Sequence, residues 1–188
     1  TVTAELVLAE LSLPLVVKPD NSGSSIGVSI VHSKEELSLA IASVARDSEI
    51  VVIEQYIRGR EIQVGILDGK ALPSIEIIPK DSFYDYKNKY QPGLTVELCP
   101  APITAGETAA VQQLAERVYA ALHLEAYGRA DFLMDKNDGV IYCLEANTLP
   151  GMTPTSLIPQ MAAAEGISFG ELCEKIIEVS LKKYGQED

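Results

Sequence analysis

Two carboxylates and an amide flank a turn signal in the last third of the chain. Asp131, Glu145 and Asn147 lie in two apolar-rich runs, and the sequence Asn137-Asp138-Gly139 stands between them. Apolar runs on either side of such a sequence predict an antiparallel β-hairpin. Oxygen ligands from Asp, Glu and Asn suit Mg²⁺ or Mn²⁺. The residue types therefore point to a metal site.

The hairpin also predicts which side chains meet. With a loop of three residues, 137–139, Asp131 faces Glu145 and Arg129 faces Asn147. Alternate residues share a face, so all four side chains project from one side. Directly facing positions lie roughly 5 Å apart, and like charges there are destabilising without a counter-charge. The alternative interpretation is two solvated carboxylates on an exposed face.

Bulk properties narrow the class of protein. A chain of 188 residues with 47% hydrophobic content can bury a core, as one large domain or two small ones. The net charge of −12 argues against a partner with a phosphate backbone, so we expect no nucleic acid. No apolar run approaches the roughly 20 residues that cross a bilayer, so we expect no membrane association.

The cysteines and the start of the chain give two further expectations. Cys99, Cys143 and Cys173 are odd in number and form no C-x-x-C pair, which favours a reducing, cytoplasmic environment over disulfides or zinc. We expect Cys143 to be a small core residue facing Leu133. The chain begins at Thr1, and residues 3–11 look like the tail of a helix under way, so we expect a fragment.

The first elements surround a Gly/Ser loop. Residues 14–19 predict a buried strand that ends at Lys18, and the loop 20–27 offers backbone amides and hydroxyls for phosphate. Residues 23–27 also match the G-x-S-x-G pattern of serine hydrolases, but that pattern needs a helix directly after it. Residues 28–31 alternate like a strand. We therefore favour a hairpin with a flexible tip.

The remaining pattern predicts an α+β protein in two domains, 1–70 and 71–188. Ser33 and Thr104 each open a capping box before a helical apolar stripe, and Ser168 caps a last helix. Strands are predicted at 50–57, 60–67 and 72–79. Residues 81–93 combine aromatics and lysines without a clean period, which is typical of a lid or binding loop.

Five motifs in this order resemble the ATP-grasp ligases. Residues 83–90 narrow the resemblance to the D-alanine–D-alanine ligase family, and the similarity runs from about Leu13 to the last helix. The five motifs are Val-Val-Lys18-Pro, Gly23-Ser-Ser-Ile-Gly27, Ile-Glu54-Gln-Tyr-Ile57, Gly128-Arg-Ala-Asp131 and Leu-Glu145-Ala-Asn147-Thr-Leu-Pro-Gly-Met-Thr153. The resemblance implies an α+β ATP-grasp fold, in which two α+β subdomains grip ATP between antiparallel sheets.

The family's activity follows as an expectation. The resemblance implies ATP-dependent joining of two D-alanine molecules through an acyl phosphate, for peptidoglycan precursor synthesis in the cytoplasm. The cofactors it implies are ATP and two Mg²⁺ (or Mn²⁺) ions, and it implies a homodimer for the intact enzyme. The family's N-terminal domain is missing here, so we expect the fragment alone to be inactive. A Mg-nucleotide-binding module without turnover, and a sister ligase that uses D-serine or D-lactate, are the alternatives.

The resemblance also assigns roles residue by residue. The metal ligands are Asp131, Glu145 and Asn147, and the oxyanion is stabilised by Arg129 and the amide of Gly151. The nucleotide contacts are Lys18, Ser25, Glu54, Gln55, Tyr56, Ile57, Glu61 and Lys89. Ser24, Glu61 and Tyr90 resemble the family's closure triad, and Tyr84, Ser156 and Leu157 lie where the second substrate is held.

Overall fold

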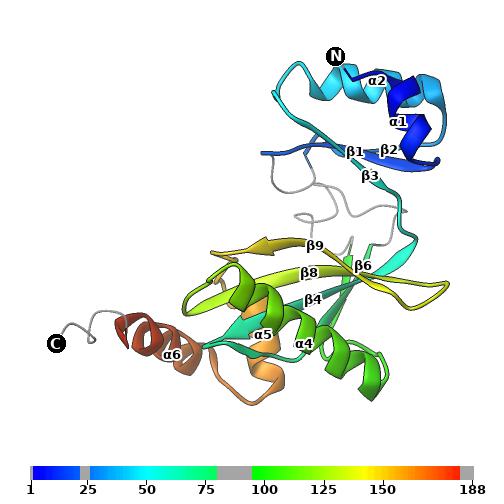
Figure 1. The fold of residues 1–188 in the computed structure, drawn as a ribbon. Coiled ribbons are helices and arrows are strands. Elements are labelled where there is room, and N and C mark those ends of the chain that lie inside the picture. Colours follow the sequence, from blue (N-terminus) through cyan, green and yellow to red (C-terminus); the bar gives the residue numbers. More distant parts are fainter. Residues whose placement is uncertain (1, 22–25, 80–94, 183–188) are drawn as a thin grey trace. The chain divides into compact units, whose positions relative to one another are not determined.

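The computed structural model describes residues 2–21, 26–79 and 95–182, and the chain divides into two compact units (Figure 1). The first unit comprises Thr1–Ile57 with Pro79–Thr95, and the second comprises Arg58–Ile78 with Val96–Asp188. Each unit has its own sheet and its own helices. The predicted α+β class is confirmed.

The first unit is a three-stranded antiparallel sheet covered on one face by two helices. Its elements are α1 (Ala4–Glu10), β1 (Leu15–Pro19), β2 (Ser29–Val31), α2 (Lys34–Val44) and β3 (Val51–Gln55), with strand order β2-β1-β3. Leu15 and Val17 of β1 are fully buried in the core with Leu37 of α2. Strand alternation therefore turns Lys18 to the face away from the helices.

Local signals set where these elements begin. The Ser33 hydroxyl accepts a hydrogen bond from the Glu36 amide at 3.1 Å and caps α2 as predicted. Thr3 caps α1, so this helix begins at Ala4, whereas we expected a helix already under way. A strand, β2, follows the Gly/Ser loop where a serine-hydrolase elbow needs a helix, and the hydrolase interpretation is therefore excluded.

The second unit is a larger antiparallel sheet with three helices. Its strands are β4 (Gly59–Leu67), β5 (Lys70–Ala71), β6 (Ile75–Pro79), β7 (Thr95–Leu98), β8 (Tyr127–Asp135) and β9 (Ile141–Asn147). Their order is β7-β6-β4-β8-β9, and β5 pairs with β4. The helices are α4 (Ala105–Ala121), α5 (Leu157–Ala164) and α6 (Phe169–Lys182).

The boundary between the units differs from the one we expected after residue 70. Strand β4 pairs along its length with β8, from Gly59 opposite Asp135 to Leu67 opposite Tyr127. The strand that we assigned to the smaller domain is thus the centre of the larger sheet. Sequence proximity favoured the smaller domain, but the residues of β4 pair with residues that lie 60 to 76 positions further along the chain, from Leu67 opposite Tyr127 to Gly59 opposite Asp135.

Helices cover both faces of the larger sheet (Figure 1). Ile62, Val64 and Ile66 alternate along β4 and pack into one core with Val111 and Ala115 of α4. Gly65 points the other way, and a side chain there would meet Ile158 and Met161 of α5. The capping box at the start of α4 is present as predicted: the Thr104 hydroxyl accepts from the Glu107 amide, and the Glu107 carboxylate accepts from the Thr104 amide.

The β8–β9 hairpin contains an irregularity that the sequence analysis did not anticipate. Its connection is longer than predicted, because the Asp135 amide bonds to the Val140 carbonyl at 2.9 Å, leaving residues 136–139 as the loop. A register shift then follows between Asp131 and Phe132, so Cys143 faces Phe132 rather than Leu133. The longer loop and the shift compensate, and Asp131 still faces Glu145 as predicted.

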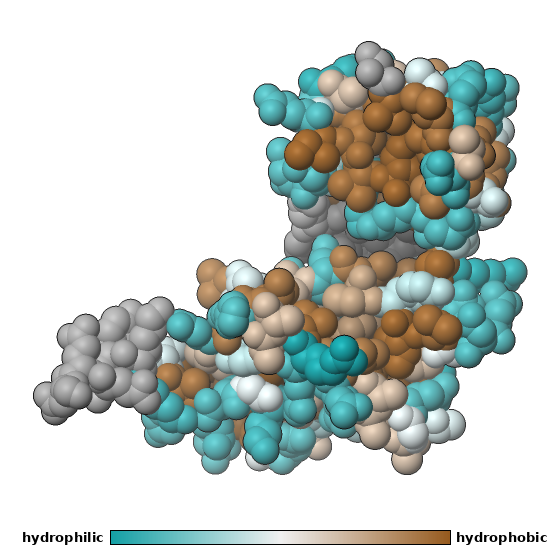
Figure 2. Space-filling view, viewed as in Figure 1, coloured by the Kyte–Doolittle hydropathy of each residue, from teal (hydrophilic) through white to brown (hydrophobic). Residues whose placement is uncertain are grey.

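The surface of the first unit carries several exposed apolar side chains. Val2 is 58% exposed, Leu6 62% and Leu39 72%. Figure 2 shows a broad hydrophobic area on the visible face of this unit.

Among the described helices, none is long and apolar enough to cross a membrane.

Candidate functional site

Six polar residues gather on one face of the larger sheet, which we call the polar cluster: Glu61, Gln63, Arg129, Asp131, Glu145 and Asn147. The strand register places them there. Gln63 faces Asp131, which faces Glu145, and in the next row Gly65 faces Arg129, which faces Asn147. Facing residues share a side of the sheet, so the cluster lies on the face that α5 covers at Gly65.

Arg129 and Asp131 form a two-pronged ion pair at the centre of this cluster. The Arg129 Nε donates to Asp131 Oδ1 at 2.7 Å, and its Nη2 donates to Oδ2 at 2.9 Å. Asp131 is only 4% exposed. We expected a metal ion to be the counter-charge between the facing carboxylates, and the chain itself supplies one in Arg129. The carboxylate pair alone therefore does not require a metal.

The oxygen set nevertheless fits a hard cation. The Asn147 Nδ2 donates to Asp131 Oδ2 and to Glu145 Oε1, each at 3.2 Å, so one amide lies between the two carboxylates. A cation at that position is favoured by the same two oxygens, and rotation of the amide adds a third. No cluster of three or more His, Cys, Asp or Glu side chains suits a metal in the described ranges, which leaves this mixed set as the candidate.

Gln63 is a member of the cluster that the sequence analysis missed. Its side chain is 2% exposed, and its Nε2 donates to Glu61 Oε1 at 2.8 Å. The alternation of β4 carries the signal, because Glu61, Gln63 and Gly65 share a face between three buried aliphatic residues. A glutamine at such a position is rarely buried without a polar partner.

The first unit contributes a separate polar pair. Lys18 Nζ lies 2.8 Å from Glu54 Oε1, and both side chains project from the sheet face opposite the helices. The two residues that we assigned to the nucleotide are thus neighbours. Phosphate binding by Lys18 would exchange this ion pair for another, which costs little because both side chains are partly exposed.

The residues after Glu54 have structural partners. The Gln55 side chain donates to the carbonyls of Ser12 at 2.8 Å and Pro14 at 3.0 Å. The Tyr56 amide also bonds to the Pro14 carbonyl, at 3.2 Å. These bonds attach the end of β3 to the start of β1. The Gln55 side-chain amide and the Tyr56 backbone amide are therefore already engaged, and an adenine contact by residues 55–57 would use other groups of this segment.

A tight turn precedes α5 and presents the predicted substrate residues. The Ser156 hydroxyl accepts from the Thr153 amide at 3.0 Å, and Leu157 is the first residue of the helix. A side chain at Gly151 would lie 3.0 Å from the Ser156 oxygen. A larger residue at 151 would therefore require the Ser156 hydroxyl to shift by a few tenths of an ångström.

Five predicted site residues lie outside the described ranges. They are Ser24, Ser25, Tyr84, Lys89 and Tyr90. Their assigned roles stay predictions.

The structure contradicts the prediction that Cys143 is a small core residue, because the residue is exposed at the surface of the hairpin. Partial desolvation of the thiol raises its pKa, and the negative charges of Asp131 and Glu145 raise it further. The thiol is therefore protonated at neutral pH and is a poor metal ligand.

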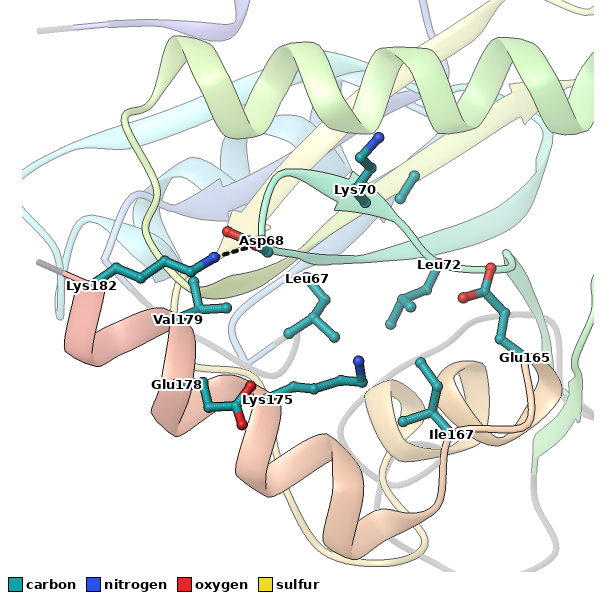
Figure 3. A pocket seen from close by; sticks show the side chains of 11 residues that line it. Leu67, Asp68, Lys70, Leu72, Glu165, Ile167, Lys175, Glu178, Val179 and Lys182 are labelled. Atoms are coloured by element: carbon teal, nitrogen blue, oxygen red, sulfur yellow. Dashed lines mark hydrogen bonds and ion pairs between the residues drawn. The ribbon is translucent and has the colours of Figure 1, made fainter.

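A cavity of about 290 Å³ lies elsewhere in the second unit, between the β4–β5 turn and α6 (Figure 3). Asp68 and Lys182 pair across its rim at 2.8 Å, and the Lys175 side chain extends into it. None of the predicted site residues lines this cavity.

Comparisons with known proteins agree with this architecture. The family model described as D-ala D-ala ligase C-terminus matches residues 2–178. D-alanine–D-alanine ligase from Methylacidiphilum infernorum is 47% identical over 171 residues, covering 91% of this chain and 56% of the relative. The ligase of Syntrophotalea carbinolica is 48% identical, covering 90% of this chain and 55% of the relative.

Solved structures give the same result. D-alanine–D-alanine ligase from Bacillus anthracis has a TM-score of 0.84 at 41% identity, covering 98% of this chain and 60% of that one. Its complex with ATP has a TM-score of 0.77 at 37% identity, covering 96% and 55%. VanG D-Ala:D-Ser ligase from Enterococcus faecalis has a TM-score of 0.81 at 32% identity, covering 93% and 52%.

The antiparallel sheets and these neighbours define an α+β protein of the ATP-grasp fold. More particularly, the chain belongs to the D-alanine–D-alanine ligase family and matches its C-terminal part. It spans about 55% of the length of the curated relatives that it matches.

Proposed function

We propose that this chain carries the nucleotide-binding and metal-binding part of an ATP-dependent ligase that joins two D-alanine molecules. The observation that carries the proposal is the polar cluster, in which Asp131, Glu145 and Asn147 converge within hydrogen-bond reach beside Arg129. The relatives bearing the name D-alanine–D-alanine ligase support this reaction, and the resemblance of the motifs implies its place in peptidoglycan precursor synthesis. We place the reaction in the cytoplasm, and the intact enzyme in a homodimer.

The proposed reaction has two steps that balance. The carboxylate of the first D-alanine attacks the γ-phosphorus of ATP, and ADP leaves with the electrons of the broken P–O bond. The amine of the second D-alanine then attacks the carbonyl carbon of the acyl phosphate. Inorganic phosphate leaves, and the amine gives up a proton. Both steps gather negative charge on oxygen, so they need cations and hydrogen-bond donors.

The chain's residues divide this work. Mg²⁺, when bound by Asp131, Glu145 and Asn147, would neutralise charge on the phosphoryl group. Arg129 is already fixed by Asp131, so its guanidinium is oriented before substrate arrives. The Gly151 amide has no hydrogen-bond partner among the described residues and is available to an oxyanion.

The remaining roles concern binding. Lys18 and Lys89 would hold phosphates, with Ser25 in the phosphate loop. Glu54 with Gln55, Tyr56 and Ile57 would bind adenine. Glu61 would bind the ribose or join Ser24 and Tyr90 in closing the site. Tyr84, Ser156 and Leu157 would hold the second amino acid.

A second candidate is a ligase whose acceptor is D-serine. The similarity to VanG D-Ala:D-Ser ligase favours it, because that protein shares the fold at 32% identity. A third is a Mg-nucleotide-binding module without turnover.

One assay separates these candidates. Phosphate release from ATP is measured with a protein that contains this chain at the full length of its relatives, offering D-alanine, D-serine and D-lactate in turn. We expect release with D-alanine alone and a D-alanyl-D-alanine product. Release that needs D-serine as acceptor would favour the second candidate. Nucleotide binding without release would favour the third.

A further inference from the structure

The Gln63 side chain is satisfied at one end only. Its Oε1 is buried and has no hydrogen-bond partner in the described part of the chain. Its Nε2 donates to Glu61 Oε1 at 2.8 Å, and this bond sets the orientation of the amide. Turning the amide over would place its oxygen against a carboxylate oxygen, and both atoms are acceptors. The Glu61 carboxylate therefore fixes the orientation of the amide and leaves Oε1 without a partner.

The facing residues on the two adjacent strands cannot supply the missing donor. Its cross-strand partners are Asp131 on β8 and Ile75 on β6. An ionised carboxylate only accepts hydrogen bonds, and isoleucine has no polar group. The Nε and one Nη of Arg129 are held by Asp131. A buried acceptor without a donor is destabilising, and such groups are often completed by a ligand or an ordered water.

We propose that Gln63 is a positioning residue of the metal site, whose Oε1 accepts a hydrogen bond from a water molecule bound to Mg²⁺. This inference rests on the proposed function. Mg²⁺ in proteins keeps several of its waters, and each needs an acceptor. Asp131, a proposed ligand, is the direct cross-strand neighbour of Gln63. The same amide holds Glu61 through its Nε2, so one side chain links the metal to Glu61.

An ordered water unrelated to any metal is the competing explanation. A trapped water typically bridges buried polar groups and belongs to the fold in every state. The two explanations differ in one measurable respect. Loss of the Oε1 acceptor weakens metal binding only if the metal's water is the donor.

The test measures Mn²⁺ binding to the chain by electron paramagnetic resonance, in the presence of saturating ADP. For Gln63→Met, which keeps the length and removes both polar groups, we expect about tenfold weaker Mn²⁺ binding, typical for loss of a partner one layer from a metal. ADP binding without metal, measured by calorimetry, should weaken less than Mn²⁺ binding, because Gln63→Met releases Glu61 and leaves the other proposed nucleotide contacts in place. For Gln63→Glu, which keeps an acceptor, Mn²⁺ affinity should match or exceed that of the wild type.

Ile75→Val is the matched control. It alters the other cross-strand neighbour of Gln63 and leaves every polar group in place, so we expect wild-type Mn²⁺ affinity. Equal Mn²⁺ affinity in Gln63→Met and the wild type would overturn the role of Gln63 and leave the proposed function intact. Absence of Mn²⁺ binding in the wild type with ADP would overturn both. Equal losses in Gln63→Met and Ile75→Val would assign the effect to packing and also overturn the proposal.

Discussion

Asp131 holds the polar cluster together at the scale of single residues. It accepts two hydrogen bonds from Arg129 and one from Asn147, while Glu145 accepts one from Asn147. Arg129 neutralises one of the two carboxylates, and Glu145 is the one with no cation beside it among the described residues. Glu145 is therefore the side chain that gains most from a bound metal.

Replacing Glu145 by glutamine tests the metal site directly. The change removes one charged oxygen and keeps the shape, so we expect most activity of the intact enzyme to be lost at ordinary Mg²⁺ concentrations. Raised Mg²⁺ should restore part of it. Steady-state rates as a function of Mg²⁺ check this. Near-normal turnover would remove the hairpin from the proposed mechanism.

Tyr84 is predicted to influence the choice of acceptor. By resemblance, ligases specific for D-alanine carry tyrosine at this position and relatives that use D-lactate do not. A phenol can complete a hydrogen-bond network that favours an amine over a hydroxy acid. We expect Tyr84→Phe to shift the products of the intact enzyme toward D-alanyl-D-lactate, measured by mass spectrometry. A depsipeptide as the main wild-type product at neutral pH would contradict the assignment.

At the scale of elements, the contact between α5 and β4 positions the turn that carries Ser156. The contact depends on the lack of a side chain at Gly65, where a Cβ would lie 2.7 Å from Ile158 Cδ1 and 3.1 Å from Met161 Sδ. The Gly65 amide itself donates to the Met161 sulfur at 3.0 Å. The helix therefore lies directly against the strand backbone.

Gly65→Ala should weaken this contact. Overpacking a core typically costs about 1–3 kcal/mol, and we expect a loss of unfolding free energy in that range. Gly106→Ala in α4 is the control, because a Cβ there meets nothing within 4 Å. Alanine at a helical position should stabilise by about 0.5–1 kcal/mol. Urea unfolding of both variants measures the difference, and equal effects would refute the close approach.

The capping box of α4 should respond to pH. Hydrogen bonds from the Thr104 hydroxyl and the Thr104 amide lower the pKa of Glu107 below its ordinary 4.5. The ionised carboxylate is thus favoured in the folded state. The ionised Glu107 carboxylate stabilises the fold fully above the ordinary pKa of 4.5, and this stabilisation is lost as the pH falls through the lowered pKa of the folded state. At pH 6 we expect the amides in the first turn of α4 to exchange faster in Glu107→Gln than in the wild type. In strongly acidic solution the two exchange rates should be equal.

At the scale of the molecule, these 188 residues carry several parts of the proposed site. Lys18, Glu54, Glu61 and the metal ligands are present. By resemblance, a further phosphate-contacting lysine and much of the first D-alanine site belong to the part of the family that these residues do not match. The span of about 55% of the relatives' length accords with that division.

We expect these 188 residues to fold, to bind Mg-nucleotide weakly and to make no dipeptide. One lost charge-assisted hydrogen bond is worth about 1.5–3 kcal/mol, which weakens ATP binding roughly tenfold or more. Lost positioning of substrate does more damage, because orientation can supply about 7–11 kcal/mol of barrier lowering. Calorimetry with Mg-ADP and a phosphate-release assay check both points. Turnover that depends on D-alanine would show that these 188 residues are sufficient for the reaction.

Short-range chemistry in the sequence determined much of this molecule. Capping residues predicted the starts of α2, α4 and α6, and alternation with the Asn-Asp-Gly signal predicted the β8–β9 hairpin. The motifs determined the family. These features depend on residues that are close in the sequence, so the pattern of residue types in a short segment is enough to predict them.

Only the tertiary structure decided which strands meet. Pairing between distant segments placed β4 in the larger sheet and Gln63 opposite Asp131. It also set the register shift beside Phe132. A one-residue change in register reverses the face of every following side chain, and no local pattern fixes such a shift. The facing of Asp131 and Glu145 was predicted correctly because the longer loop and the shift cancel, which only the paired strands reveal.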